Sequence, residues 1–140
     1  MKKRVSILPG ALALAFLALP AFADEIKGAD RILCSISSVN HCSEDNECSD
    51  DIPSNINVPK FMEVDLAGKK VQSTKASGEN RSSSVDLKRD GGLVIIQGFE
   101  NGRAFSIVIS ETTGRSSMAV ARDGIVVSAF GACTPIATAK

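Results

Sequence analysis

From residue 82 onward, apolar and polar residues alternate over short segments that are separated by turn-forming residues. A period of two is typical of β-strands with one buried face. The segments predicted as strands are residues 83–88, 93–99, 104–110, 116–121 and 125–130. Asn101-Gly102 lies between two of these segments and favours a type I′ turn, because both turn positions require a positive φ. Glu100 and Arg103 flank that turn and are placed to form a cross-strand ion pair.

The first half of the chain contains fewer predicted strands and more loop. Residues 32–39 and 61–66 have the apolar positions of strands, and residues 71–73 are predicted to pair back after a turn at 67–70. Residues 40–59 are rich in Ser, Asp, Asn and Pro. We therefore predict a long connection between the first two strands.

About eight short strands, joined by hairpins and without a convincing helix, predict an all-β fold. Sequential hairpins make an antiparallel meander. Closing that meander into a small up-and-down barrel, or a strongly curled sheet, removes its exposed edges. A two-sheet sandwich is the alternative. We assign a single domain to residues 32–134, with a flexible leader at 24–31 and a tail at 135–140.

Residues 1–23 have the three parts of a secretory signal peptide. A basic start at residues 2–4 is followed by an apolar run over 5–19, and residues 21–23 supply an A-x-A cleavage site. The apolar run is shorter than the ~20 residues of a membrane-spanning helix, so we expect cleavage and no stable membrane anchor. The arrangement is typical of bacteria. It predicts a periplasmic or secreted protein that begins near Asp24.

Charge and composition narrow the possible partners. The chain has 16 Lys and Arg against 16 Asp and Glu, and three of the basic residues belong to the predicted signal peptide. The mature chain is therefore mildly acidic and lacks the basic cluster expected of a protein that binds nucleic acid or an anionic membrane. With no Trp and no Tyr, the chain is also a poor candidate for stacking sugars on aromatic rings.

Four cysteines, Cys34, Cys42, Cys48 and Cys133, lie in the predicted mature chain. An even number of cysteines in an exported protein indicates disulfides. Of the three possible pairings, we predict Cys42–Cys48, which closes a short polar loop, and Cys34–Cys133, which ties the first strand to the last. The alternative is a zinc site that adds His41, but its spacing is unusual and an oxidising compartment works against free thiolates.

The remaining candidate chemistry is sparse. His41 is the single histidine, and without a G-x-S-x-G elbow we predict a solvated loop residue and not a catalytic base. The acidic stretch at residues 44–51 offers oxygen ligands to calcium but lacks the usual calcium-loop pattern. A solvated acidic loop, or a patch that docks a basic protein, is the preferred interpretation. We predict no catalytic residue, no cofactor and no metal.

The interior of a barrel of this size holds packed side chains or one small ligand. Phe99, Phe105 and Phe130 are the candidates to line or fill it. Because the chain has few large side chains, we favour a filled interior.

Residues 97–106 (QGFENGRAFS) and 130–134 (FGACT) resemble a family of small exported bacterial β proteins without an assigned function. The resemblance implies no activity. The arrangement of strands and cysteines also loosely resembles the periplasmic inhibitors of c-type lysozyme, whose inhibitory motifs are not matched. We expect an exported, non-enzymatic module that binds a periplasmic protein or a small apolar ligand. The alternative is an inhibitor of a secreted hydrolase such as a lysozyme.

Overall fold

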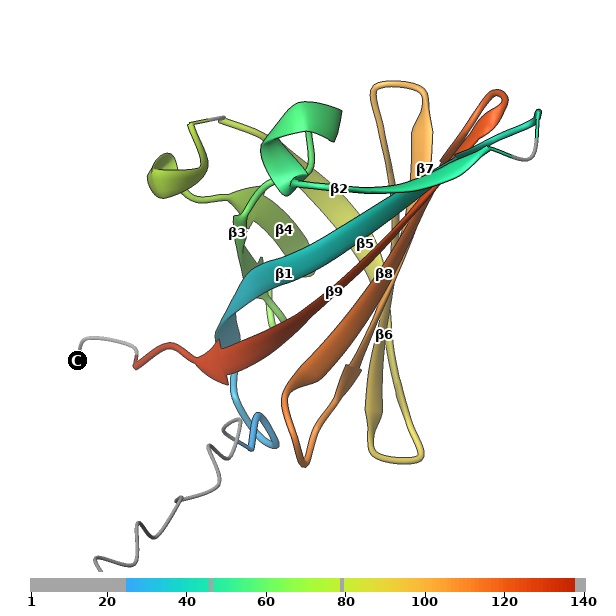
Figure 1. Cartoon of the computed structure of the whole chain (residues 1–140). Helices are drawn as coiled ribbons and strands as arrows, with labels where there is room; N and C mark the ends of the chain where they lie inside the picture. Colours follow the sequence, from blue (N-terminus) through green and yellow to red (C-terminus); the bar gives the residue numbers. More distant parts are fainter. Residues whose placement is uncertain (1–24, 46, 79, 138–140) are drawn as a thin grey trace, which may run out of the picture.

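A computed structural model describes residues 25–45, 47–78 and 80–137 (Figure 1). The predicted signal peptide at residues 1–23 lies outside this part of the chain. The described residues form strands and two short 3₁₀ turns, with no α-helix among them, as predicted. Within the same ranges, no helix has the length and apolar character needed to cross a membrane.

The described chain forms nine strands in one antiparallel sheet. In chain order, with the two 3₁₀ turns, the elements are β1 (Arg31–Ser43), β2 (Cys48–Asp51), η1 (Pro53–Ile56), β3 (Phe61–Asp65), β4 (Lys70–Ser73), η2 (Lys75–Ser77), β5 (Ser82–Asp90), β6 (Leu93–Glu100), β7 (Arg103–Ser110), β8 (Arg115–Arg122) and β9 (Ile125–Pro135). Neighbours along the chain pair from β3 to β9, and β9 pairs back onto β1, so eight strands close a barrel. The predicted up-and-down barrel is confirmed.

The ninth strand, β2, adds to the barrel at one end. The first part of β1 pairs with β3, and its last part pairs with β2 along the same edge. The prediction of a long connection over residues 40–59 was therefore wrong for its first half. Residues 40–43 continue β1 because β9 pairs with them on one side and β2 on the other. These are long-range pairings that local polarity does not reveal.

Backbone conformation explains the tight hairpins and the curvature of the barrel. Asn101 and Gly102 have φ values of 48° and 75°, as a type I′ turn requires. On β9, a Cβ at Gly131 would lie 2.0 Å from the carbonyl oxygen of Ser35, so only glycine allows β1 and β9 to approach there. The pairing of β1 with β9 shifts register between Ile36 and Ser38, and such a bulge bends the sheet.

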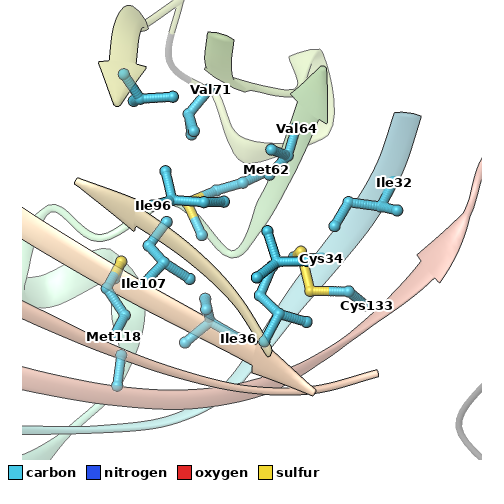
Figure 2. Close-up of a cluster of buried hydrophobic side chains, with 14 of the residues drawn as sticks. Ile32, Cys34, Ile36, Met62, Val64, Val71, Ile96, Ile107, Met118 and Cys133 are labelled. Atoms are coloured by element: carbon cyan, nitrogen blue, oxygen red, sulfur yellow. A yellow bond between two sulfur atoms is a disulfide. The ribbon is translucent and has the colours of Figure 1, made fainter. Parts of the chain in front are cut away.

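One end of the barrel interior is densely packed, and we call it the closed end. Ile32, Val64, Val94, Ile96 and Ile109 are 0% exposed. The Cys34–Cys133 disulfide is part of this core, and Figure 2 shows its sulfur atoms between β1 and β9, close to the buried isoleucines. Fully buried branched side chains at this density account for much of the stability of a small domain.

The segment before β1 also belongs to the closed end. Ile26 is 0% exposed, and its backbone N–H donates to the carbonyl oxygen of Glu111 (2.8 Å) in the turn between β7 and β8. Residues 24–31 were predicted as a flexible leader. In the structure, the described part of this segment instead lies beside the lower end of the barrel in Figure 1, next to the turn between β7 and β8. A single buried isoleucine in a polar stretch gives no periodicity that sequence reasoning could detect.

Candidate functional site

The opposite end of the barrel interior holds a cavity of about 420 Å³, and we call it the open end. This size is within the usual range for a small-molecule site, about 300–1,000 Å³. Its lower wall is apolar and is formed chiefly by Met62, Val71, Phe105, Ile107, Met118 and Val127. The prediction of a filled interior therefore holds at the closed end and was wrong at the open end.

Strand alternation explains which side chains line the cavity. On β7, the alternate residues Phe105, Ile107 and Ile109 lie on the inner face of the barrel, which we call the inward phase of the strand. Ile107 lies opposite Met118 of β8. Figure 2 shows Met62, Ile107 and Met118 directed into the barrel from three strands. Ile109 lies beyond the cavity, in the packed core. The boundary between the open end and the closed end therefore lies between Ile107 and Ile109, two residues apart on β7.

Only one of the three phenylalanines proposed for the interior is there. Phe99 and Phe130 are 68% and 50% exposed, so they lie on the outer surface. Phe105 lines the cavity and lies over Gly98, where a Cβ would be 2.3 Å from the ring Cζ atom. The missing side chain at Gly98 lets the ring lie against β6, which leaves space in the cavity open.

An ion pair closes one side of the cavity mouth. Arg81 precedes β5, and its Nε donates to Glu100 Oε2 (3.0 Å) while its Nη1 donates to the carbonyl oxygen of Asn57 (2.8 Å). The Arg81 and Glu100 side chains are 21% and 17% exposed. These bonds join three segments that are distant in sequence. The hydrogen bond from Arg81 is the main reason that the pKa of Glu100 is lowered; burial opposes this, and the charges of Arg81 and Arg103 support it.

The predicted ion pair between Glu100 and Arg103 is replaced by this contact. Glu100 and Arg103 are cross-strand neighbours, as expected from the turn between them. However, the carboxylate of Glu100 is directed to Arg81. Arg103 and Arg122 also line the mouth, and neither forms an ion pair with any residue in the described ranges. Sequence reasoning missed this rim because Arg81 is brought to it by the closed topology.

His41 lies on β1 and lines the cavity mouth, so it is not the solvated loop residue that was predicted. Its Nε2 lies 3.4 Å from Ser49 Oγ, and its Nδ1 lies 3.9 Å from Asp51 Oδ2. The residue types are those of a Ser-His-Asp triad, and both distances are longer than the about 2.6–3.2 Å of a catalytic hydrogen bond, as they often are in a structure without ligand. Asp51 Oδ1 instead accepts bonds from the Ile52 N–H and the Asn55 amide. We interpret the three residues as supports of the β1–β2 hairpin.

The cysteine predictions are confirmed. Cys34–Cys133 and Cys42–Cys48 are disulfides, and each joins directly opposed positions on neighbouring strands. No described cysteine is free. The zinc alternative is therefore wrong, because all of its thiolates are consumed. The calcium alternative gains no support either: within residues 25–45, 47–78 and 80–137, no three His, Cys, Asp or Glu side chains gather as a metal site.

Comparison with family models, curated proteins and solved structures gave no match to this chain. The two resemblances described above therefore stay predictions.

The sequence did contain a sign of the open end. The inward phase of β7 continues from Ile107 and Phe105 to Arg103, and that of β8 continues from Met118 and Val120 to Arg122. At the open end, both strands therefore finish their inward-facing positions with a charged side chain. An inward phase that ends in arginine on two adjacent strands indicates a polar mouth above an apolar floor.

Proposed function

We propose that this chain is an exported binding protein that holds a small apolar ligand inside its barrel. The observation that carries the proposal is the cavity of about 420 Å³ with an apolar floor and a polar rim. Ligand sites in proteins commonly combine a mostly apolar concave wall with a few placed polar groups. An apolar cavity without an occupant loses contacts that a ligand would restore.

The size of the cavity limits the ligand. If each non-hydrogen atom takes about 30 Å³, as a water molecule does in the liquid, about a dozen such atoms fit. The cavity is open at the rim, so a longer ligand can extend into solvent. A single short alkyl chain or one small ring system matches this volume.

Export to the periplasm or the medium is part of the proposal. The apolar run at residues 5–19 and the cleavage pattern at 21–23 support it. The two disulfides indicate an oxidising compartment.

Titration with decan-1-ol tests the cavity without involving charge. We expect saturable binding by isothermal calorimetry, and a loss of about tenfold or more in Val127→Trp, because the ring fills the space that the alkyl chain needs. Val126→Trp is the matched control, since Val126 is the next residue on β9 and is 52% exposed. Val120→Phe should give an intermediate loss. Absent binding, or equal losses in the two tryptophan variants, would contradict the proposal.

A second function is favoured by a separate observation. The Cys42–Cys48 staple holds a hairpin whose Glu44, Glu47 and Asp50 side chains are exposed, beside the turn between β8 and β9. A rigid acidic hairpin suits docking to a basic protein, such as a secreted hydrolase. Inhibition of a c-type lysozyme that is weakened in Glu44→Gln/Glu47→Gln would support this function. Full lysozyme activity at a large excess of the protein would exclude it for that enzyme.

A further inference from the structure

The charges at the open end are unbalanced. Three arginines, Arg81, Arg103 and Arg122, line the cavity, against one acidic residue, Glu100. Arg81 and Glu100 bond to each other. The lining therefore keeps a surplus of positive charge that the chain does not neutralise at this mouth.

The two remaining arginines occupy neighbouring positions at the ends of adjacent strands. β7 and β8 pair in a register that places Ala104 opposite Ala121. One position further along, the same register brings Arg103 next to Arg122, and both have the inward phase. Like charges directly opposite on adjacent strands are destabilising. A chain that keeps such a pair at the mouth of a cavity gains from an anion that lies between them.

The acidic residues around the mouth do not provide that anion: Glu100 and Asp51 are engaged by other groups, and Glu44 and Asp123, at the turn between β8 and β9, form no ion pair with either arginine. Glu100 accepts its bonds from Arg81. Asp51 accepts bonds from Ile52 and Asn55 and lies on the His41 side of the mouth. Of the described residues, none forms an ion pair with Arg103 or Arg122. Both guanidinium groups therefore keep donors for an incoming oxyanion.

The apolar wall begins directly below these two arginines. Phe105 and Val120 are the next inward residues on β7 and β8, they lie opposite each other, and both line the cavity. Ile107 and Met118 follow as the next opposed pair. A ligand bound between the arginines thus extends its remaining atoms along two further pairs of apolar side chains.

We propose that the cavity binds a single-chain anionic amphiphile, with its carboxylate or similar oxyanion between Arg103 and Arg122 and its alkyl chain against Phe105, Val120, Ile107 and Met118. Guanidinium groups form strong, charge-assisted hydrogen bonds with such oxyanions. The inference rests on the proposed function and adds the chemical class of the ligand. A small anion alone lacks the apolar contacts, and a neutral alcohol lacks the ionic ones.

Three probes with the same alkyl chain separate these contributions: decanoate, decan-1-ol and decylamine, each titrated into the mature protein near pH 7. We expect decanoate to bind about tenfold or more tightly than decan-1-ol, because charge-assisted bonds usually add this much. Decylamine should bind more weakly than decan-1-ol, because its ammonium group meets the arginines. Acetate, which carries the head without the chain, should not bind measurably.

The double variant Arg103→Gln/Arg122→Gln should bind decanoate no more tightly than decan-1-ol, so the ratio of the two affinities falls about tenfold or more relative to the wild-type protein. Arg115→Gln removes one positive charge from the outer side of β8 at the closed end, and it should leave the preference for decanoate intact. Added salt should weaken only the binding of decanoate.

The outcomes distinguish the two proposals. Equal affinity of the wild-type protein for decanoate and decan-1-ol would overturn the anionic head group while the apolar cavity stands. A preference for decylamine, or a decanoate preference that survives in the double variant, would also overturn it. If none of the three probes binds, both proposals fail.

Discussion

The two ends of the barrel interior share the same strands but differ in how their inward positions are used. At the closed end, the inward side chains are branched and fully buried, and a disulfide joins β1 to β9 among them. At the open end, the same strands carry Phe105, Met118 and Arg122, which line a cavity. The closed end provides the stability that an open cavity of this size lacks, because a cavity forfeits contacts on one side of every residue that lines it. Four predictions test whether the closed end provides stability and the open end provides the cavity, and they are given in order of decreasing expected loss of stability.

The two disulfides should differ in their contribution to stability. Cys34–Cys133 spans 99 residues and Cys42–Cys48 spans 6. In the chain-entropy model, removing the first by Cys34→Ala/Cys133→Ala costs about 4–5 kcal/mol, and removing the second by the corresponding double variant costs about 2 kcal/mol. Urea denaturation of both variants gives the comparison. Equal losses would contradict a larger contribution from the disulfide at the closed end.

Ile109 and Ile107 form a matched pair on β7, two residues apart and 0% and 2% exposed. Ile109→Ala removes contacts on all sides and should cost about 3–4 kcal/mol of unfolding free energy. Ile107→Ala should cost less, about 2 kcal/mol, because Ile107 borders the cavity. Decan-1-ol affinity should fall in Ile107→Ala alone. A larger stability loss in Ile107→Ala would mean that the open end is packed in solution.

Gly98→Ala tests how the cavity is kept open. The new Cβ would lie 2.3 Å from the Phe105 ring, so the ring must swing off β6 toward the cavity. We expect a stability loss of about 1–2 kcal/mol, since overpacking is costly but the ring has space to move into. Decan-1-ol affinity should decrease, and adding Phe105→Leu should restore it. Calorimetric titration of the single and double variants measures both effects, and an unchanged affinity in Gly98→Ala would place the ring elsewhere.

Glu100→Gln tests the ion pair at the mouth through pH. Because the pKa of Glu100 is lowered in the folded protein, its contribution to stability is present above the pKa of the unfolded chain. That contribution is lost as the pH falls through the lower, folded value. The variant should lose about 1 kcal/mol near neutral pH and show a flatter acid limb of stability against pH. Parallel acid limbs in variant and wild type would exclude this role for Glu100.

Sequence reasoning succeeded where local pattern decides the structure. The alternation in residues 82–130 and the Asn101-Gly102 turn predicted five of the strands, because the strand period and the turn chemistry are properties of neighbouring residues. It failed for residues 40–43 and 48–51, which are polar on both faces. Residues 40–43 pair with β9, residues 48–51 pair with β1, and the Cys42–Cys48 bond joins the two segments. Burial of Ile26 depends on the distant turn at Glu111 and was missed for the same reason.

The candidate site was predictable only in part. An inward phase ending in Arg103 and Arg122 is present in the sequence and marks a polar mouth. The position of Arg81 beside Glu100 is not evident from the sequence, because it depends on the closure of the barrel through β4 and β5. Whether the interior is filled is also a global property, since it depends on how the side chains of all eight barrel strands sum in volume.

Methyl spectroscopy during a decanoate titration tests most directly whether one end of the barrel is an open binding cavity. The chain has three methionines, and the two that follow the predicted signal peptide, Met62 and Met118, both line the cavity. We expect saturable shifts of the Met62 and Met118 methyl signals and of the Ile107 methyl signal, while those of Ile32 and Ile109 stay unchanged. Unchanged methionine signals at concentrations where decanoate binds, or equal shifts at Ile109, would contradict this expectation.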